Sequence, residues 1–550
     1  MNTAISVLNR LHKTKTMLAG TAAVLLAVAL SACGGPSSAG GDTAKSSTLT
    51  VGLSAQVKNV DPIYAYDFTT SPVTNQVTES LLQFDKNDQI KPMLAKSWKQ
   101  PDATTYVYEI RDNVTFSDGK PMTMNDVIYS LNRYRDPSLA SYVAWMYDNV
   151  DSIKQTGAWE LTVKLKTPDA LWKYASATSG TGIVEKAVVE KAGKAYGTVN
   201  GIPIGTGAYT ISKWASGGDL TLQYNPKYWD KDGAGPDVKT IVFRPIEEDS
   251  TRVAAVTSGQ IDLDLATPVD MINQVKQSSK VKLATNPSSG LRYISFNTKQ
   301  KPFDDVNARR AVAAAIDIAS IQKNVIKDSG IPTNYLLTPE TLFVFNKETW
   351  KGYEKSAKVI TYDLAKAKEY LSQSGYPNGF TFTMTVDSKT INNNVLLAFQ
   401  QDLQKIGITC KINKVSNDET VSQQFGSGIK NGVRPYQGLM TEWSSDFPDP
   451  SGNLTPLLAS SGGGDGGSNS AQYSNPTVDA LLNKQLQSTD NTERTQLMLQ
   501  ILDIENQDVP YYVYTHQNWL FAYNPKITSG MSDASPFWYW NLYIKNFKIS

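Results

Sequence analysis

The residues best placed to do chemistry in this sequence lie in the stretch W-S-S-D-F-P-D-P, Trp443 to Pro450. Its two prolines fix φ and lack a backbone donor, so the stretch does not belong inside a helix or a central strand. We expect a rigid loop that presents the indole of Trp443 and the carboxylate of Asp446. Such a carboxylate can pair with a cation taken out of water, where an unpaired charge is strongly disfavoured. Asp449, before Pro450, suits a helix cap or a turn.

Few other side chains could act as catalysts. The chain has 2 histidines and 2 cysteines, and it contains no G-x-S-x-G and no H-E-x-x-H motif. The pattern S-x-x-K occurs at Ser117–Lys120, but there it forms a predicted turn at Gly119 and has no K-T-G partner. Cys410 lies in the alternating segment I-G-I-T-C-K-I, which indicates a packed thiol. We therefore expect no enzymatic activity, no cofactor and no metal centre.

The first 33 residues have the order of a secretory signal. Arg10, Lys13 and Lys15 precede an apolar run, Met17 to Leu30, which is shorter than the roughly 20 residues of a membrane span. The following L-S-A-C, Leu30 to Cys33, resembles the lipobox of bacterial lipoproteins. That resemblance implies cleavage before Cys33 and a diacylglycerol on its thiol, whereas the alternative is an ordinary signal with a chance cysteine.

A lipid on Cys33 would make residues 1–32 the signal peptide and residues 33–47 the lipidated cysteine with a flexible, Gly- and Ser-rich tether. The protein would then be extracytoplasmic and anchored to the cell membrane. Removal of the signal takes three cations and no acid with it, so the formal charge falls from +1 to −2. A chain of that charge lacks the basic surface typical of nucleic-acid binding.

The periodicity of the remaining chain predicts mixed α/β domains. Strict alternation of apolar and polar residues predicts strands over 105–111, 160–166 and 380–386. Asp363 and Asn475 are typical N-caps, and they predict helices that begin after them. An alanine-rich segment predicts a further helix over 309–323. The length of 550 residues indicates two to four compact units, and the glycine-rich segment 460–470 is expected to be a loop inside one of them.

Motifs along the whole processed chain resemble the extracytoplasmic solute-binding proteins of peptide-type ABC importers, the oligopeptide, dipeptide and nickel group. The matching segments occur in the family's order, and they are N-V-D-P (59–62), K-P-M-L-A-K-S-W (91–98), F-S-D-G-K-P-M-T-M-N-D-V (116–127), P-I-G-T-G-A-Y (203–209), G-Q-I-D-L (259–263), P-F-D-D-V-N-A-R-R-A-V (302–312), A-I-D (315–317), L-Q-K-I-G-I (403–408), W-S-S-D-F-P-D-P (443–450), Y-S-N-P-T-V-D-A-L-L (473–482) and N-L-Y-I-K-N (541–546).

The resemblance implies a type II periplasmic-binding-protein fold with two lobes, an extra domain and a cleft that closes about a hinge. The implied domains are lobe I over 48–79, 200–294 and 506–550, the extra domain of lobe I over 80–199, and lobe II over 295–505. It also implies that the protein delivers its ligand to an ABC permease and ATPase complex, and that it acts as a monomer.

The resemblance further implies the ligand contacts. Asp446 falls on the aspartate that pairs with the α-ammonium of a bound peptide, and Trp443 would form an apolar wall of that site. The segment Tyr66–Thr69, with Tyr66, Asp67 and Phe68, falls at the edge offered to the ligand backbone by strand addition. Tyr512 falls on a returning segment near the hinge. The competing interpretation is that Asp446 caps its own loop and that Trp443 is a core residue.

The ligand class is left between two alternatives. The first is peptides, with oligopeptides as the main expectation, because Asp446 falls on the family's ammonium-pairing position. The second is a non-peptide solute such as an oligosaccharide or a metal chelate. The 11 tryptophans and 27 tyrosines would suit sugars, and nickel prefers imidazole, of which only His516 follows the signal. The aromatic run Phe537–Trp540 is expected to be a core or hinge-edge cluster.

Overall fold

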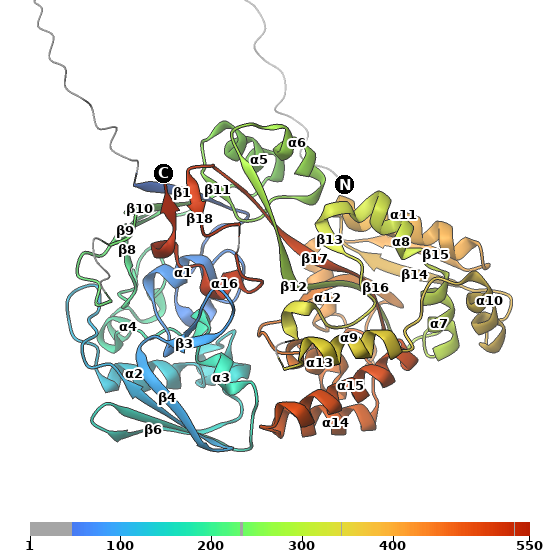
Figure 1. Ribbon diagram of the computed structural model, residues 1–550, viewed down its shortest axis with the longest axis horizontal. Helices are drawn as coiled ribbons and strands as arrows, with labels where there is room; N and C mark the ends of the chain where they lie inside the picture. The colour runs from blue at the N-terminus through green and yellow to red at the C-terminus, as the bar shows by residue number, and fades with distance from the viewer. Residues whose placement is uncertain (1–46, 231–234, 343, 533) are drawn as a thin grey trace, which may run out of the picture. The chain divides into compact units, whose positions relative to one another are not determined.

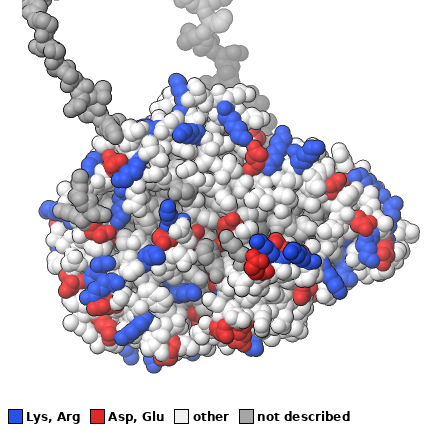
Figure 2. Space-filling view, viewed as in Figure 1, with Lys and Arg blue, Asp and Glu red and all other residues white. Residues whose placement is uncertain are grey.

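The structure is a computed structural model that describes residues 47–230, 235–342, 344–532 and 534–550. The signal peptide, Cys33 and nearly all of the tether therefore lie outside the described residues. Within the described part, no helix is both long enough and apolar enough to cross a membrane. Figure 2 shows basic and acidic side chains interspersed over one face without a broad patch of one sign, as expected from a formal charge of +1.

One mixed sheet of 11 strands runs through the protein (Figure 1). Two long antiparallel strands, β12 (Lys282–Phe296) and β17 (Tyr511–Tyr523), form its centre. On one side lie β11 (Leu263–Asp264), β1 (Thr48–Leu53), β10 (Thr240–Pro245), β9 (Leu220–Tyr224) and β8 (Tyr209–Trp214). On the other side lie β16 (Gly438–Ser444), β14 (Thr381–Val386) and β15 (Thr409–Lys414), while β13 (Gly330–Ile331) pairs with β17.

We call the part of the molecule around β1 and β8–β11 the first lobe. Its helices are α1 (Ser71–Val77), α5 (Asp249–Ser258), α6 (Ile272–Gln277) and α16 (Trp538–Asn541). Two short antiparallel pairs join β2 (Leu82–Phe84) to β3 (Ile90–Pro92) and β18 (Ile527–Ser529) to β19 (Lys548–Ile549). Apolar residues that alternate along β1, such as Leu49, Val51 and Leu53, are fully buried in its core.

A separate antiparallel sheet of 4 strands belongs to the same core as the first lobe. Its order is β4 (Ala95–Asp102), β5 (Thr105–Ile110), β7 (Glu160–Leu165) and β6 (Val150–Gly157). The accompanying helices are α2 (Met124–Arg133), the 3₁₀-helix η3 (Ala144–Tyr147), α3 (Trp172–Ala175) and α4 (Lys186–Ala192). Tyr106 and Tyr108 of β5 point into the shared core with 2 % and 0 % exposure, so this sheet packs by one face only.

We call the part around β13–β16 the second lobe, and it has a core on each face of its sheet. One core contains Ile294 and Met440 with the helices α7 (Val306–Ala315), α10 (Leu364–Gln373) and α11 (Thr390–Gln404). The other contains Tyr293 with α9 (Lys347–Ser356), α13 (Ser451–Leu458), α14 (Pro476–Gln487) and α15 (Asn491–Asp508). Successive residues of β12 thus serve opposite cores, as the pleat of a strand requires. The helix α12 (Asn417–Gln424) lies beside β16.

The two long strands are irregular where they pass from one lobe to the other. The pairing of β12 with β17 shifts register between Pro287 and Leu291, and again between Arg292 and Tyr293. Ser288 bridges the irregular segment, because its hydroxyl donates to the Gln517 carbonyl at 2.9 Å and accepts from the Gly290 amide at 2.9 Å. A bulge of this kind bends a strand locally, and it lies where β12 passes from the first lobe to the second.

Most of the predicted elements are present, and one is wrong. The predicted strands correspond to β5, β7 and β14, and Asp363 and Asn475 cap α10 and α14 through their side chains. The single helix predicted over 309–323 is instead two helices, because Ile316 is extended and the side chain of Asp317 accepts from the Ser320 amide to start α8 (Ile318–Ile321). A π-helix, η7 (Gln322–Ile326), follows it directly. The cap at Asp317 outweighs the helix propensity of the alanines.

Candidate ligand-binding site

Asp446 lies in the loop after β16, against two segments of the first lobe. The Tyr66 side chain faces its carboxylate and interacts with it. The Trp540 indole nitrogen donates to the Asp446 carbonyl at 2.9 Å, and the Tyr539 hydroxyl donates to the neighbouring Ser445 carbonyl at 2.8 Å. The loop that presents the carboxylate is therefore held between the lobes.

The electrostatics of Asp446 are those of a carboxylate that lacks a counter-charge. Burial raises the pKa of Asp446 to about 7, and the hydrogen bond from Tyr66 lowers it only in part. Among the described residues, no Lys, Arg or His is paired with it. Such a group favours any ligand that brings a positive charge, because the charge replaces the lost hydration.

The rest of the loop is fixed by a buried ion pair and by its own hydrogen bonds. Arg494 of α15 donates to both oxygens of Asp449, at 2.8 and 2.9 Å, and these side chains are only 2 % and 0 % exposed. The Ser445 hydroxyl donates to the Phe447 carbonyl at 2.7 Å. Asp449 also accepts from the Ser451 amide at the start of α13, so its role is structural, as expected.

Trp443 faces the second lobe's own core. Its indole nitrogen donates to the Gly452 carbonyl at 2.9 Å, and its half-buried ring packs on the core beneath α13. Because side chains alternate along β16, Trp443 and Glu442 point to opposite faces of the strand. The hydrogen bond from Trp443 to Gly452 joins β16 to the start of α13, so it fixes both ends of the Asp446 loop.

The three side chains of the segment Tyr66–Phe68 have different roles. The Tyr66 ring packs against Trp540 at a centroid distance of 5.8 Å while its hydroxyl reaches Asp446. The Phe68 side chain is 43 % exposed and packs edge-on to Tyr539 at 4.9 Å. The Asp67 carboxylate is turned to its own backbone, where it accepts from the amides of Thr69 and Thr70, both at 2.7 Å. The structure thus brings Tyr66 and Phe68 to the site, but it commits the Asp67 carboxylate to local bonds.

Tyr512 is not brought into this group. It lies on β17 with 5 % exposure inside the second lobe's core, where its ring packs edge-on to Phe399 at 6.3 Å. Residues on the same strand that do lie at the lobe junction, His516 and Gln517, are a few positions further along. Position along the strand decides this, because Tyr512 lies among the residues of the second lobe's core, four residues before His516.

Tyr539 and Trp540 contact the Asp446 loop, although sequence reasoning placed their run in a core or hinge-edge cluster. Both rings are buried, with 4 % and 1 % exposure, so the cluster expectation is also met. Trp145 was missed altogether. Its side chain interacts with that of Tyr66, and its ring centroid lies 5.8 Å from that of Phe447. No local pattern distinguishes these aromatics from core residues, since only the fold places them against Asp446.

A cluster of charged residues surrounds Glu442, which lies on β16 four positions before Asp446. Glu442 is 44 % exposed and lies 3.4 Å from the Lys389 ammonium and 3.6 Å from the Arg292 guanidinium. The positive charge of Lys389, and to a smaller extent that of Arg292, lowers the pKa of Glu442 to about 2. β14 pairs with β16 only as far as Met440, which leaves the edge of β16 beyond that residue without a neighbouring strand on that side.

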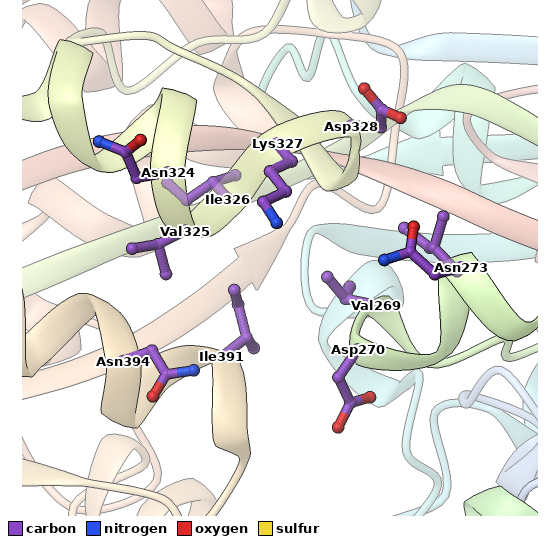
Figure 3. A pocket seen from close by; sticks show the side chains of 11 residues that line it. Val269, Asp270, Asn273, Asn324, Val325, Ile326, Lys327, Asp328, Ile391 and Asn394 are labelled. Atoms are coloured by element: carbon purple, nitrogen blue, oxygen red, sulfur yellow. The ribbon is translucent and has the colours of Figure 1, made fainter.

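A pocket of about 310 Å³ adjoins this charged cluster at the first turn of α11 (Figure 3). The Asn392 side chain accepts from Arg292 at 3.4 Å, while Ile391 and Asn394 of the same turn line the pocket. The first lobe contributes Val269, Asp270 and Asn273, and the second lobe contributes the segment 324–328. Figure 3 shows the Lys327 side chain pointing into the space between the two sets.

Lys327 is the cation of this pocket. It has a φ of 53°, a left-handed conformation that is uncommon for a residue other than glycine. Its ammonium has no hydrogen bond or ion pair to any described residue. The neighbouring Asp328 pairs instead with Lys276 of α6 in the first lobe, at 2.7 Å.

Comparison with known proteins agrees with this architecture. Residues 89–465 match the family model for bacterial extracellular solute-binding proteins, family 5. The glutathione-binding protein GsiB of Escherichia coli K12 is 27 % identical over 483 residues, which are 87 % of this chain and 91 % of that protein.

Two solved structures with the same fold cover nearly the whole chain. DppA of Helicobacter pylori in complex with the peptide STSA has a TM-score of 0.74 at 22 % identity, and it covers 91 % of this chain and 98 % of its own. NikZ of Campylobacter jejuni in complex with Ni(L-His) also has a TM-score of 0.74 at 22 % identity, and it covers 91 % and 99 %. The expected two-lobed periplasmic-binding-protein fold is thereby confirmed. The chain belongs to family 5 of the bacterial extracellular solute-binding proteins.

Proposed function

We propose that the protein binds peptides with a free amino terminus between its two lobes and delivers them to an ABC importer. The observation that carries the proposal is the Asp446 carboxylate, which is held between the lobes next to Tyr66 and has no cationic partner among the described residues. A peptide α-ammonium supplies the missing charge. A charge-assisted hydrogen bond of this kind contributes about 1.5–3 kcal/mol net.

The ligand backbone is expected to run along the open edge of β16. Beyond Met440 this edge has no pairing with β14, and on that stretch the Glu442 carbonyl already accepts from the Gln424 side chain at 3.0 Å. Main-chain hydrogen bonds to the remaining groups of such an edge are indifferent to side chains. Tyr66 and Phe68 would cover the ligand from the first lobe. This arrangement suits ligands that vary in sequence.

The opposite end of the ligand is expected to meet positive charge. Arg292 and Lys389 lie beside Glu442, four residues before Asp446, which corresponds to about 13 Å along a strand. A peptide of about three or four residues has that length when extended. A longer peptide would continue past the first turn of α11 toward Lys327. Peptide binding by the relatives supports this choice, since GsiB is a glutathione-binding protein and DppA was solved with a peptide.

A metal chelate is the less favoured ligand. The His516 side chain is 1 % exposed and contacts the Ser288 carbonyl and Glu340. The described residues contain no group of three or more His, Cys, Asp or Glu side chains that could hold a metal ion. A chelated metal would therefore have to bring its own ligands, as the histidine does in the nickel complex of NikZ.

We infer that the remaining predictions made from the sequence hold for the mature protein. Cys33 would carry a lipid that keeps the protein at the membrane, and the lobes would close as a monomer that docks on the permease and ATPase complex. The proposed domains are lobe I over 48–79, 200–294 and 506–550, its extra domain over 80–199 and lobe II over 295–505, with one change. The crossing between the lobes is moved to the irregular segment near Ser288, because Tyr293, Ile294 and Tyr512 pack in the cores of the second lobe. No bond of the ligand would be made or broken.

The test compares free and N-acetylated peptides by calorimetry. In Asp446→Asn, binding of tripeptides with a free amino terminus should fall about 10- to 100-fold, while N-acetylated peptides, which already bind poorly, should change little. Asp67→Asn is the matched control, because it removes one negative charge from the neighbouring first-lobe segment and keeps a capping side chain. Equal losses for both peptide types in Asp446→Asn would contradict the proposal.

A further inference from the structure

Phe447 belongs to the second lobe by its backbone and to the first lobe by its ring. The residue follows Asp446 directly, and its carbonyl accepts from the Ser445 hydroxyl at 2.7 Å within the second-lobe loop. Its side chain is 1 % exposed and lies in the hydrophobic core of the first lobe. No other residue between 297 and 510 belongs to that core among the described residues.

The ring of Phe447 completes a stack that begins inside the first lobe. Phe84 of β2 stacks on Tyr174 of α3 at a centroid distance of 6.2 Å and an interplanar angle of 22°. Tyr174 in turn stacks on Phe447 at 5.7 Å and 20°. Trp145 of η3 covers the side at 5.8 Å. Offset stacking at these distances is favourable beyond the area that it buries.

Phe447 loses these contacts if the lobes separate. Its ring has no place in either core of the second lobe, so an open molecule would expose it to water. Burying a phenylalanine side chain contributes roughly 1.5–3 kcal/mol, which corresponds to about 10- to 100-fold in an equilibrium constant. The neighbouring backbone contact between the lobes, from the Ala170 amide to the Leu486 carbonyl at 2.9 Å, breaks in the same movement.

We propose that Phe447 is a positioning residue that couples ligand capture to closure. It is next to the carboxylate that is neutralised by the ligand, and the rigid loop makes the two side chains move together. Docking of the Phe447 ring on Tyr174 carries Asp446 to Tyr66, and separation of the lobes withdraws both. This proposal rests on the proposed function only for the identity of the ligand, because the closing movement of the lobes does not require a ligand.

Two variants of the full chain test this role. Phe447→Leu should weaken peptide binding about tenfold, yet leave the thermal unfolding midpoint of the ligand-free protein unchanged, because the ring is not buried in an open molecule. The matched control is Phe382→Leu, which alters a ring that is 1 % exposed in a core formed by the second lobe alone. That control should lower the unfolding midpoint and leave the dissociation constant unchanged.

A ligand-free measurement separates this proposal from the identity of the ligand. In a protein with Ala170→Cys and Leu486→Cys, the hydrogen-bonded backbones put the two thiols within disulfide range when the lobes are closed. Phe447→Leu should slow the formation of this disulfide about tenfold. Proteins that carry only one of the two substitutions control for disulfides with the natural cysteines, such as the free Cys410. If Asp446→Asn weakened binding of free and N-acetylated peptides equally, the assignment of the ligand would be wrong. The rate of disulfide formation would still test the role of Phe447, because it is measured without ligand.

An unchanged disulfide rate in Phe447→Leu would overturn the proposal. So would a fall in the unfolding midpoint of ligand-free Phe447→Leu equal to that of Phe382→Leu, because it would make Phe447 an ordinary core residue in every state of the protein.

Discussion

The Tyr66 side chain of the first lobe faces the Asp446 carboxylate of the second lobe and interacts with it. This contact joins a residue near the beginning of the described chain to one 380 positions later. It places a carboxylate with a raised pKa at the junction that opens and closes. Because a neutral phenol cannot balance the charge, the site keeps its preference for a cation.

The first prediction concerns the pH dependence of peptide binding. The pKa of Asp446 is raised to about 7 in the ligand-free protein, and a bound ammonium would lower it. The affinity is therefore fully present above about pH 7 and should fall as the pH decreases, by up to about tenfold per unit. Calorimetry from pH 5 to 7.5 measures this, and Asp446→Asn should flatten the profile. An affinity that rises toward low pH would contradict the assignment.

The second prediction concerns the carboxyl end of the ligand. Lys389→Met should weaken binding of short peptides with a free carboxyl terminus about 3- to 10-fold, because Lys389 is partly exposed and its charge is partly screened. C-terminally amidated peptides should be affected much less. Lys366→Met, which removes an exposed lysine on α10, is the control. A loss of the same size for both kinds of peptide would place the carboxylate elsewhere.

The third prediction concerns the buried ion pair behind the loop. Arg494→Met leaves the Asp449 carboxylate buried without its partner, which should lower the free energy of unfolding by about 3–5 kcal/mol. Denaturant unfolding of the ligand-free protein measures it. Lys366→Met breaks a solvent-exposed pair and should stay close to the wild type. If the two variants unfolded alike, the pair would not be what fixes the loop.

The fourth prediction concerns the anchor. Replacement of the cysteine in Cys33→Ser should release the protein from the membrane fraction, because the thiol that is proposed to carry the lipid is lost. Fractionation of cells and mass measurement of the processed N-terminus would test this. The wild-type protein should carry the mass of a lipid, and a wild-type chain cut at another residue would favour the ordinary secretory signal.

Local signals in the sequence were sufficient for the elements and for the family. Alternation fixed strands such as β14, and the caps Asp363 and Asn475 fixed where α10 and α14 begin. The exception, the break between α7 and α8, arises because the Asp317 cap competes with a run of helix-forming alanines. The resemblance of the ordered motifs implies a ligand-binding role for Asp446, and that role stays a prediction.

The composition of the site was decided by tertiary structure. Tyr539 and Trp540 reach the Asp446 loop although about 90 residues separate them in the chain, and Tyr512 was expected near the ligand but lies in a core. Motif and periodicity act over a few residues, so the sequence by itself determined the family, the elements and the one carboxylate. Which aromatic rings close over that carboxylate depends on how β12 and β17 carry the two lobes together, and no local pattern contains that information.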